Sequence, residues 1–247
     1  VSQRRWGYLA GDDNSRNKAL NPQRPASLIA FARGGWGAAR LLEQNQPWKP
    51  GWMVGFSDAT SLLLARLASG LDGCVHGPLL TTLAKEPPWS QDRLRSLLFG
   101  ELVENIQGEG WGNGLAIGPL VVANLTIASH LLGTKYLPDL NGAILILEDI
   151  GEAPYRIDRM LTQWRLAGIL QNLAGIGFGN FVDCEDNENL PANQTFRLQQ
   201  VLKERTADLG IPLVAHLPIG HNCGNAALPL GRQASIDGNK GLLKLLA

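Results

Sequence analysis

The chain has 247 residues, of which 45% are hydrophobic and 18% are charged, and its formal net charge at pH 7 is zero. This length can bury a core in one large domain or in two smaller ones that share a cleft. The composition excludes an intrinsically disordered chain, and the balanced charge argues against a nucleic-acid partner, which would favour an excess of basic side chains.

The three cysteines, Cys74, Cys184 and Cys223, are widely separated and form no CxxC pair. They predict neither a disulfide scaffold nor a zinc cluster, and they favour a reducing compartment such as the cytoplasm. No apolar run reaches the roughly 18 residues that a membrane-spanning helix needs, so we expect no membrane partner. The chain begins at Val1 without an initiator methionine or a signal peptide, and we expect that its first elements are missing from the sequence.

The N-terminal part of the chain repeats one structural unit. An apolar run over 26–32 predicts a strand, a glycine-rich turn follows it, and the residues after the turn favour a helix. A second apolar run over 52–56 predicts another strand, and strong helix formers follow over 57–68. Strands that alternate with helices predict an α/β fold of the Rossmann type, in which functional groups gather at the carboxyl ends of parallel strands.

Residues 86–114 are polar and rich in proline, tryptophan and glycine, the composition of a connection rather than of a core element. We therefore predict an N-terminal α/β domain over 1–100, a linker over 101–114 and a smaller C-terminal α/β domain over 115–247. The C-terminal domain is predicted to contain strands at 115–122, 143–147, 175–181 and 212–217, and helices at 124–132 and 154–173.

Ser57 stands where the second predicted strand passes into a helix, with Gly55 two residues before it and Ala59 two residues after it. Small neighbours permit a sharp turn that exposes the serine hydroxyl at the start of a helix, which is the pattern of a nucleophile elbow. The same serine is equally suited to cap the helix, so this segment alone does not decide its role.

A serine nucleophile needs a base such as histidine, and the chain has four histidines. His221 follows a predicted strand and has small residues around it, which makes it the best base. His130 falls in a predicted helix, and the spacing of His216 within a strand favours packing. His76 lies near a strand end, where it is a candidate for lining the substrate pocket.

The carboxylate that orients this histidine has three candidates. Glu148 follows five apolar residues, so a strand would deliver it to the edge of the sheet. Asp149 and Glu152 lie just before a predicted helix, where acidic side chains also favour the positive end of the helix dipole. Spacing favours Glu148 but leaves the other two open.

Oxyanion stabilisation needs two backbone N–H donors, commonly one from the residue after the nucleophile and one from a neighbouring glycine turn. Asp58 together with Gly34 or Gly35 fits this description. The glycine turn is also compatible with a simple tight turn or a phosphate-binding loop, although the sequence has no dinucleotide-binding or P-loop motif. Trp36, within that turn, is a candidate for contacting the substrate.

Short motifs along nearly the whole chain form an ordered set: Tyr8 to Gly11, Ala32 to Gly37 with Arg40 to Leu42, Gly55 to Asp58 with Thr60, His76 to Pro78, Leu132 to Thr134, Leu147 to Ile150 with Glu152, Pro154 to Leu161, Gly220 with His221, and Leu228 to Gly231. Together they resemble the LD-carboxypeptidase family of serine peptidases, which includes murein tetrapeptide carboxypeptidases and microcin-immunity peptidases. The ordered set is far more specific than any of its members.

The resemblance implies Ser57 as nucleophile, His221 as general base and then general acid, and Glu148 as the third member of the triad. It implies hydrolysis of an amide bond between an L-centre and a D-amino acid, such as the terminal D-alanine of a cytoplasmic muropeptide in peptidoglycan recycling. No metal or other cofactor is implied, and family members are usually homodimers.

Two alternatives remain open from the sequence. A related amide hydrolase would use the same triad on a peptidyl-nucleotide or another acyl conjugate, and a non-catalytic binding module would keep the fold alone. One departure from the family bears on the pocket wall, since Val122 and Ala123 precede Asn124 where the family often has two glycines.

Overall fold

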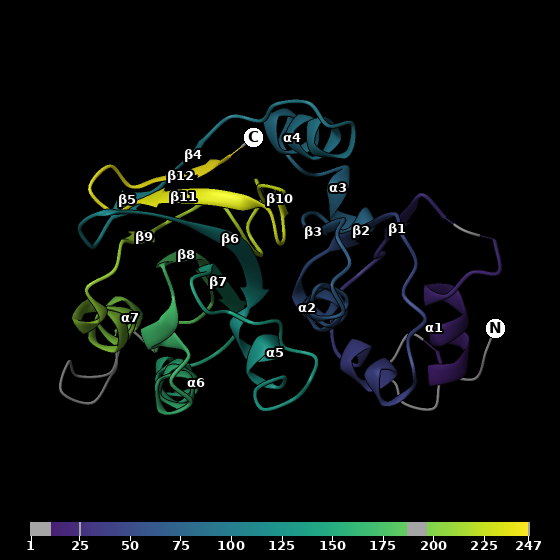
Figure 1. The fold of residues 1–247 in the computed structure, drawn as a ribbon, viewed down its shortest axis with the longest axis horizontal. Coiled ribbons are helices and arrows are strands. Elements are labelled where there is room, and N and C mark those ends of the chain that lie inside the picture. The colour runs from purple at the N-terminus through teal and green to yellow at the C-terminus, as the bar shows by residue number, and fades with distance from the viewer. Residues whose placement is uncertain (1–10, 25, 187–196, 247) are drawn as a thin grey trace.

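The computed structural model describes residues 11–24, 26–186 and 197–246 (Figure 1). Two sheets organise this part of the chain, one with four strands in the order β1-β2-β3-β10 and one with eight strands in the order β4-β12-β11-β6-β7-β8-β9-β5. Figure 1 shows the small sheet with α1 and α2 on one side of the molecule, and the large sheet with α5, α6 and α7 on the other. The predicted α/β class with two domains is confirmed. The sequence predicts the smaller domain at the C-terminus, but the larger sheet lies there.

The N-terminal lobe alternates short strands with helices. Its strands β1, β2 and β3 are parallel, and β10 returns from the end of the chain to pair antiparallel with β3. The bounds are α1 (Asp13–Leu20), β1 (Leu28–Ala30), η1 (Ala38–Glu43), β2 (Trp52–Gly55), η2 (Ser57–Ala59), α2 (Thr60–Ala68), β3 (Cys74–His76), α3 (Leu80–Leu83), α4 (Pro88–Leu98) and β10 (Leu228–Pro229). In α2 the residues from Thr60 to Arg66 are all buried, as expected for a helix that is covered on every side.

The C-terminal lobe has four central parallel strands, β6, β7, β8 and β9, with antiparallel strands added at both edges. Residues 144–147 of β7 have no exposed surface, because a strand inside a parallel sheet is covered on both faces. The bounds are β4 (Ile106–Gln107), β5 (Glu109–Gly110), β6 (Leu115–Asn124), α5 (Leu125–Ser129), β7 (Ile144–Ile150), α6 (Pro154–Leu166), η3 (Leu170–Asn172), β8 (Gly175–Val182), α7 (Leu198–Thr206), η4 (Ala207–Leu209), β9 (Leu213–Ala215), β11 (Gln233–Asp237) and β12 (Leu242–Leu245).

Two expectations about individual elements are wrong. Residues 88–98 are not a mere connection, because they form helix α4, which buries Ser90, Arg93 and Leu94. The prolines that suggested a loop stand before and at the first position of this helix, where the missing N–H costs nothing. Helix α6 ends at Leu166, seven residues earlier than expected, and Gly168 at φ +73° stops it in the left-handed region.

Residues 101–114, the predicted linker, contribute β4 and β5 to the large sheet. Across the ranges that the structure describes, no helix combines the length and the apolar character needed to cross a bilayer.

Candidate active site

Ser57 occupies a sharp turn between β2 and the helical residues that follow. Its φ of +62° lies in the left-handed region, which costs a non-glycine residue about 1–3 kcal/mol. A Cβ placed on Gly55 would lie 3.0 Å from the Cβ of Ala59 and 2.8 Å from a ring carbon of Phe31, so the crowded turn requires a glycine there. The hydroxyl does not cap the helix, since no side-chain cap is formed at η2 or α2.

Two hydrogen bonds in series connect Ser57 to a histidine and a carboxylate. His221 Nε2 lies 3.1 Å from Ser57 Oγ, and His221 Nδ1 lies 2.7 Å from Glu148 Oε2. The serine comes from the N-terminal lobe, whereas the other two side chains come from β7 and from the loop after β9 in the C-terminal lobe. The three side chains predicted as a triad are therefore within hydrogen-bond reach across the boundary between the lobes.

Glu148 is fully buried at the carboxyl end of β7. Burial raises the pKa of its carboxyl group, and the hydrogen bond from His221 opposes that rise. A carboxylate that accepts from Nδ1–H fixes the imidazole tautomer and leaves Nε2 free to accept the serine proton. Gly220 makes the close approach possible, because it has φ +118° and its Cβ would lie 2.8 Å from Glu148 Oε2.

The two rival carboxylates have other partners. Asp149 accepts from Asn124 Nδ2 at 3.0 Å and from the N–H and hydroxyl of Thr126 at 2.9 and 2.8 Å, so it fixes the start of α5. Glu152 forms an ion pair with Arg156 at 3.4 Å. Of the three carboxylates that spacing left open, Glu148 is the one that bonds to His221.

The structure changes the interpretation of two other histidines. His76 has no exposed surface and packs against the ring of Phe56, so the expectation that it lines the substrate pocket is wrong. Burial lowers the pKa of His76 to about 3, which keeps its ring neutral. His216 does not lie inside a strand, because it follows β9 at φ +55° and is mostly exposed. Its ring still packs edge-on against Trp111 with centroids 5.7 Å apart, and it approaches Glu109 at 3.4 Å.

The glycine turn lies directly over the serine. A Cβ on Gly34 would be 2.8 Å from Ser57 Oγ, so a side chain at this position would collide with the hydroxyl. The carboxylate of Asp58 ties the turn to the elbow by accepting from the N–H of Ala38 at 2.9 Å. Burial raises the pKa of Asp58, and hydrogen bonds from the backbone N–H groups of Ala38 and Gly37 oppose the rise.

Trp36 is 41% exposed and packs edge-on against His130, the residue that follows α5. With Gly34 and Asp58 it borders a cavity of about 330 Å³ beside the elbow. Its contact with substrate, and the oxyanion role of the N–H groups of Gly34, Gly35 and Asp58, stay predictions.

Two site residues were not singled out from the sequence. The ring of Phe56 packs edge-on against His221 with centroids 4.7 Å apart. Asn225 accepts from the N–H of Gly220 through Oδ1 at 3.0 Å, which fixes the peptide just before His221. The available signal for Asn225 was its place among the small residues that follow His221, where a polar side chain can bond to the backbone of the same loop.

Comparisons with known proteins agree with this architecture. A family model described as the LD-carboxypeptidase N-terminal domain matches residues 1–77, and one described as the LD-carboxypeptidase C-terminal domain matches residues 117–236. The first match includes the motif from Tyr8 to Gly11, of which residues 8–10 lie outside the described residues.

Curated relatives and solved structures cover almost the whole chain. The murein tetrapeptide carboxypeptidase of Pseudomonas aeruginosa is 33% identical over 96% of this chain and 81% of its own length. A Synechocystis protein named as a carboxypeptidase is 47% identical over 98% of this chain and 81% of its own length. The crystal structure of muramoyltetrapeptide carboxypeptidase from Oxalobacter formigenes superimposes with a TM-score of 0.83 at 26% identity, covering 99% of this chain and 88% of that one. The chain belongs to the LD-carboxypeptidase family.

Proposed function

We propose that this protein is a serine carboxypeptidase that hydrolyses the amide bond between an L-centre and a terminal D-amino acid. The observation that carries the proposal is the pair of hydrogen bonds that joins Ser57, His221 and Glu148 in series. Ser57 is the nucleophile, His221 is the base and then the acid, and Glu148 orients the imidazole and stabilises its protonated form.

The reaction proceeds in two halves. Nε2 of His221 takes the hydroxyl proton while Oγ of Ser57 bonds to the carbonyl carbon, and the resulting oxyanion receives hydrogen bonds from N–H groups of Asp58 and the glycine turn. The imidazolium then gives its proton to the leaving nitrogen, the C–N bond breaks, and an acyl-enzyme remains. Water, deprotonated by His221, attacks the ester carbonyl, and return of the proton to Oγ releases the shortened peptide.

The substrate that we propose is a murein tetrapeptide that loses its terminal D-alanine in the cytoplasm during peptidoglycan recycling, with the enzyme acting as a homodimer. The names of the Pseudomonas and Oxalobacter relatives support this substrate class. The three dispersed free cysteines support the reducing compartment.

Release of D-alanine from a murein tetrapeptide, followed by mass spectrometry, tests the proposal. We expect release by the wild-type protein and none above background by Ser57→Ala. Ser96→Ala is the matched control, because the Ser96 hydroxyl is bonded to Glu101 at the surface, away from the triad. Unchanged release by Ser57→Ala would exclude the triad.

A second candidate is an amide hydrolase that acts on a peptidyl-nucleotide conjugate. The Escherichia coli microcin C7 self-immunity protein is 26% identical over 51% of this chain. A structure of that protein with glutamyl sulfamoyl guanosine shares the fold, with a TM-score of 0.77 at 20% identity. Incubation with both substrate types separates the candidates, and failure of a fluorophosphonate to label Ser57, with no turnover of either, would favour a binding module.

A further inference from the structure

Four residues of the N-terminal lobe contact the loop that carries His221. They are Glu86, Trp89, Ser90 and Arg93, and we call them the clasp. The last three belong to α4, and the spacing of three and four residues puts Ser90 and Arg93 on one face of that helix, with Glu86 just before its start. Glu86 and Ser90 are 8% and 0% exposed, so this face is buried against the loop.

The clasp holds the backbone of the loop at residues 224 and 225. Oε2 of Glu86 accepts from the N–H of Gly224 at 2.7 Å and from the N–H of Asn225 at 3.0 Å. The hydroxyl of Ser90 donates to the carbonyl oxygen of Asn225 at 2.8 Å. Hydrogen bonds to a buried carboxylate are among the stronger kinds, so these contacts fix the loop firmly.

Asn225 links the backbone held by Glu86 to the residue before His221. Its Oδ1 accepts from the N–H of Gly220, and the N–H of Ala226 donates to the carbonyl of Pro218 at 2.8 Å. The loop is thus closed at its base, and the residue before His221 is bonded to the residue that Glu86 holds. Movement of Glu86 would therefore move the imidazole.

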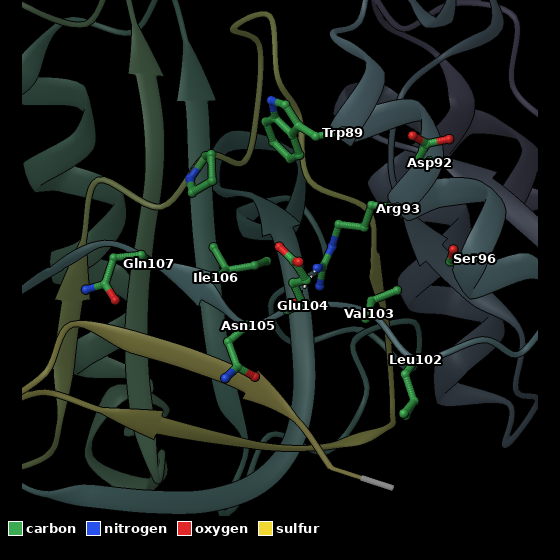
Figure 2. Close-up of a pocket in the computed structure, with 11 residues that line it drawn as sticks. Trp89, Asp92, Arg93, Ser96, Leu102, Val103, Glu104, Asn105, Ile106 and Gln107 are labelled. Atoms are coloured by element: carbon green, nitrogen blue, oxygen red, sulfur yellow. Dashed lines mark hydrogen bonds between the residues drawn. The ribbon is translucent and has the colours of Figure 1, made fainter.

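The other two members reinforce the same contact. A Cβ on Gly224 would lie 2.9 Å from a ring carbon of Trp89, so the indole is directly against the loop. Arg93 donates to the carbonyl of Ala227 through Nε at 2.9 Å and to the carbonyl of Glu104 through Nη1 at 2.6 Å. Figure 2 shows Trp89 and Arg93 beside the pocket next to α4, with the Arg93 side chain directed at Glu104.

We propose that Glu86 is a positioning residue for the reaction: its carboxylate holds the His221 loop of one lobe in register with Ser57 of the other. This inference rests on the proposed function. The serine and the histidine belong to different lobes, so their 3.1 Å contact depends on what joins the lobes near the site. A displacement of about 1 Å in such a contact lowers the rate by roughly 100-fold.

The test compares Glu86→Ala, Glu86→Gln and the control Glu101→Ala, whose side chain is half-exposed three residues after the end of α4. Three quantities are measured: the rate of fluorophosphonate labelling at Ser57, the kcat and KM for D-alanine release, and amide hydrogen exchange over residues 218–226. For Glu86→Ala we expect labelling and kcat to fall by about 10- to 100-fold with KM within about threefold, and the loop amides to exchange faster.

Glu86→Gln is expected to recover most of both rates, because its side-chain oxygen can accept the same two N–H groups, whereas Glu101→Ala should match the wild type. Equal losses in the Gln and Ala variants, or wild-type labelling and exchange in Glu86→Ala, would overturn the inference. If Glu86→Ala does not fold, Ser90→Ala replaces it. For that variant we expect the labelling rate and kcat to fall by about threefold and the loop amides to exchange faster. A wild-type protein that is neither labelled nor active fails the proposed function instead, and the exchange measurement then still decides whether Glu86 fixes the loop.

Discussion

The two ends of the candidate triad are built in different ways. The elbow around Ser57 is shaped by neighbours two residues away, Gly55 and Ala59, and by the backbone strain of the serine itself. The loop around His221 is hydrogen-bonded to Glu148, 73 residues from the histidine, and to Glu86, 138 residues from the amide of Gly224. The candidate nucleophile therefore depends mainly on neighbours close in the sequence, whereas the candidate base is placed by contacts between segments far apart in the sequence.

The largest effect should come from removing the charge of Glu148 while keeping the shape of its side chain. We expect Glu148→Gln to lower kcat by about 10⁴-fold, because the neutral amide stabilises neither the required tautomer nor the imidazolium. Steady-state kinetics of D-alanine release measures this.

Asp149→Asn is the matched control for Glu148→Gln. The change is the same loss of charge one residue along β7, at a carboxylate that bonds Asn124 and Thr126 instead of His221. A similar loss of kcat in both variants would contradict the assignment of Glu148 and leave the carboxylates of β7 undistinguished.

The same contrast explains which features could be predicted from the sequence. Strands β1, β2, β7 and β8 were found because short apolar runs bounded by turns mark buried parallel strands, and Ser57 was found because small residues surround it. Local chemistry also selected His221. Glu148 was separated from Asp149 and Glu152 by family resemblance, because that choice depends on a contact distant in the sequence.

The features that were missed depend on tertiary contacts. The prolines and Trp89 of helix α4 predict a connection, yet its buried face packs against the loop of the other lobe. His216 continues the alternating pattern of β9, but the strand ends at Ala215 and the chain turns into the left-handed region. His76 lies at a strand end, as expected, but it has no exposed surface and packs against the ring of Phe56.

A smaller loss of activity is expected when the elbow around Ser57 is crowded. Gly34→Ala places a Cβ 2.8 Å from Ser57 Oγ, so the turn or the serine has to shift, and we expect kcat to fall by about 100-fold. Because the collision is local, Gly34→Ala should leave hydrogen exchange over residues 218–226 unchanged, whereas Glu86→Ala should raise it. Faster hydrogen exchange over residues 218–226 in Gly34→Ala would show that the elbow around Ser57 and the His221 loop are not independent.

A stability effect should follow removal of the Asp149 carboxylate. Asp149→Ala leaves the N–H of Thr126 and the amide of Asn124 without their acceptor inside the protein, and we expect the free energy of unfolding to fall by about 2–3 kcal/mol. Urea unfolding measures the change. Glu152→Ala, which removes an exposed ion pair, should change it by less than about 0.5 kcal/mol, and equal losses would contradict the structural role of Asp149.

The smallest effect, expressed per pH unit, is a dependence of stability on pH that arises from a buried histidine in the core beneath the site. Because burial lowers the pKa of His76 to about 3 from its ordinary value of 6.5, the unfolded chain takes up a proton between these values and the folded chain does not. His76 therefore makes the protein less stable as pH falls below 6.5, by at most about 1.4 kcal/mol per pH unit. The variant His76→Asn lacks this titration, so its unfolding free energy should fall less steeply between about pH 7 and pH 4.5. A wild-type slope in His76→Asn would mean that the buried ring is protonated as readily in the folded state as in the unfolded one.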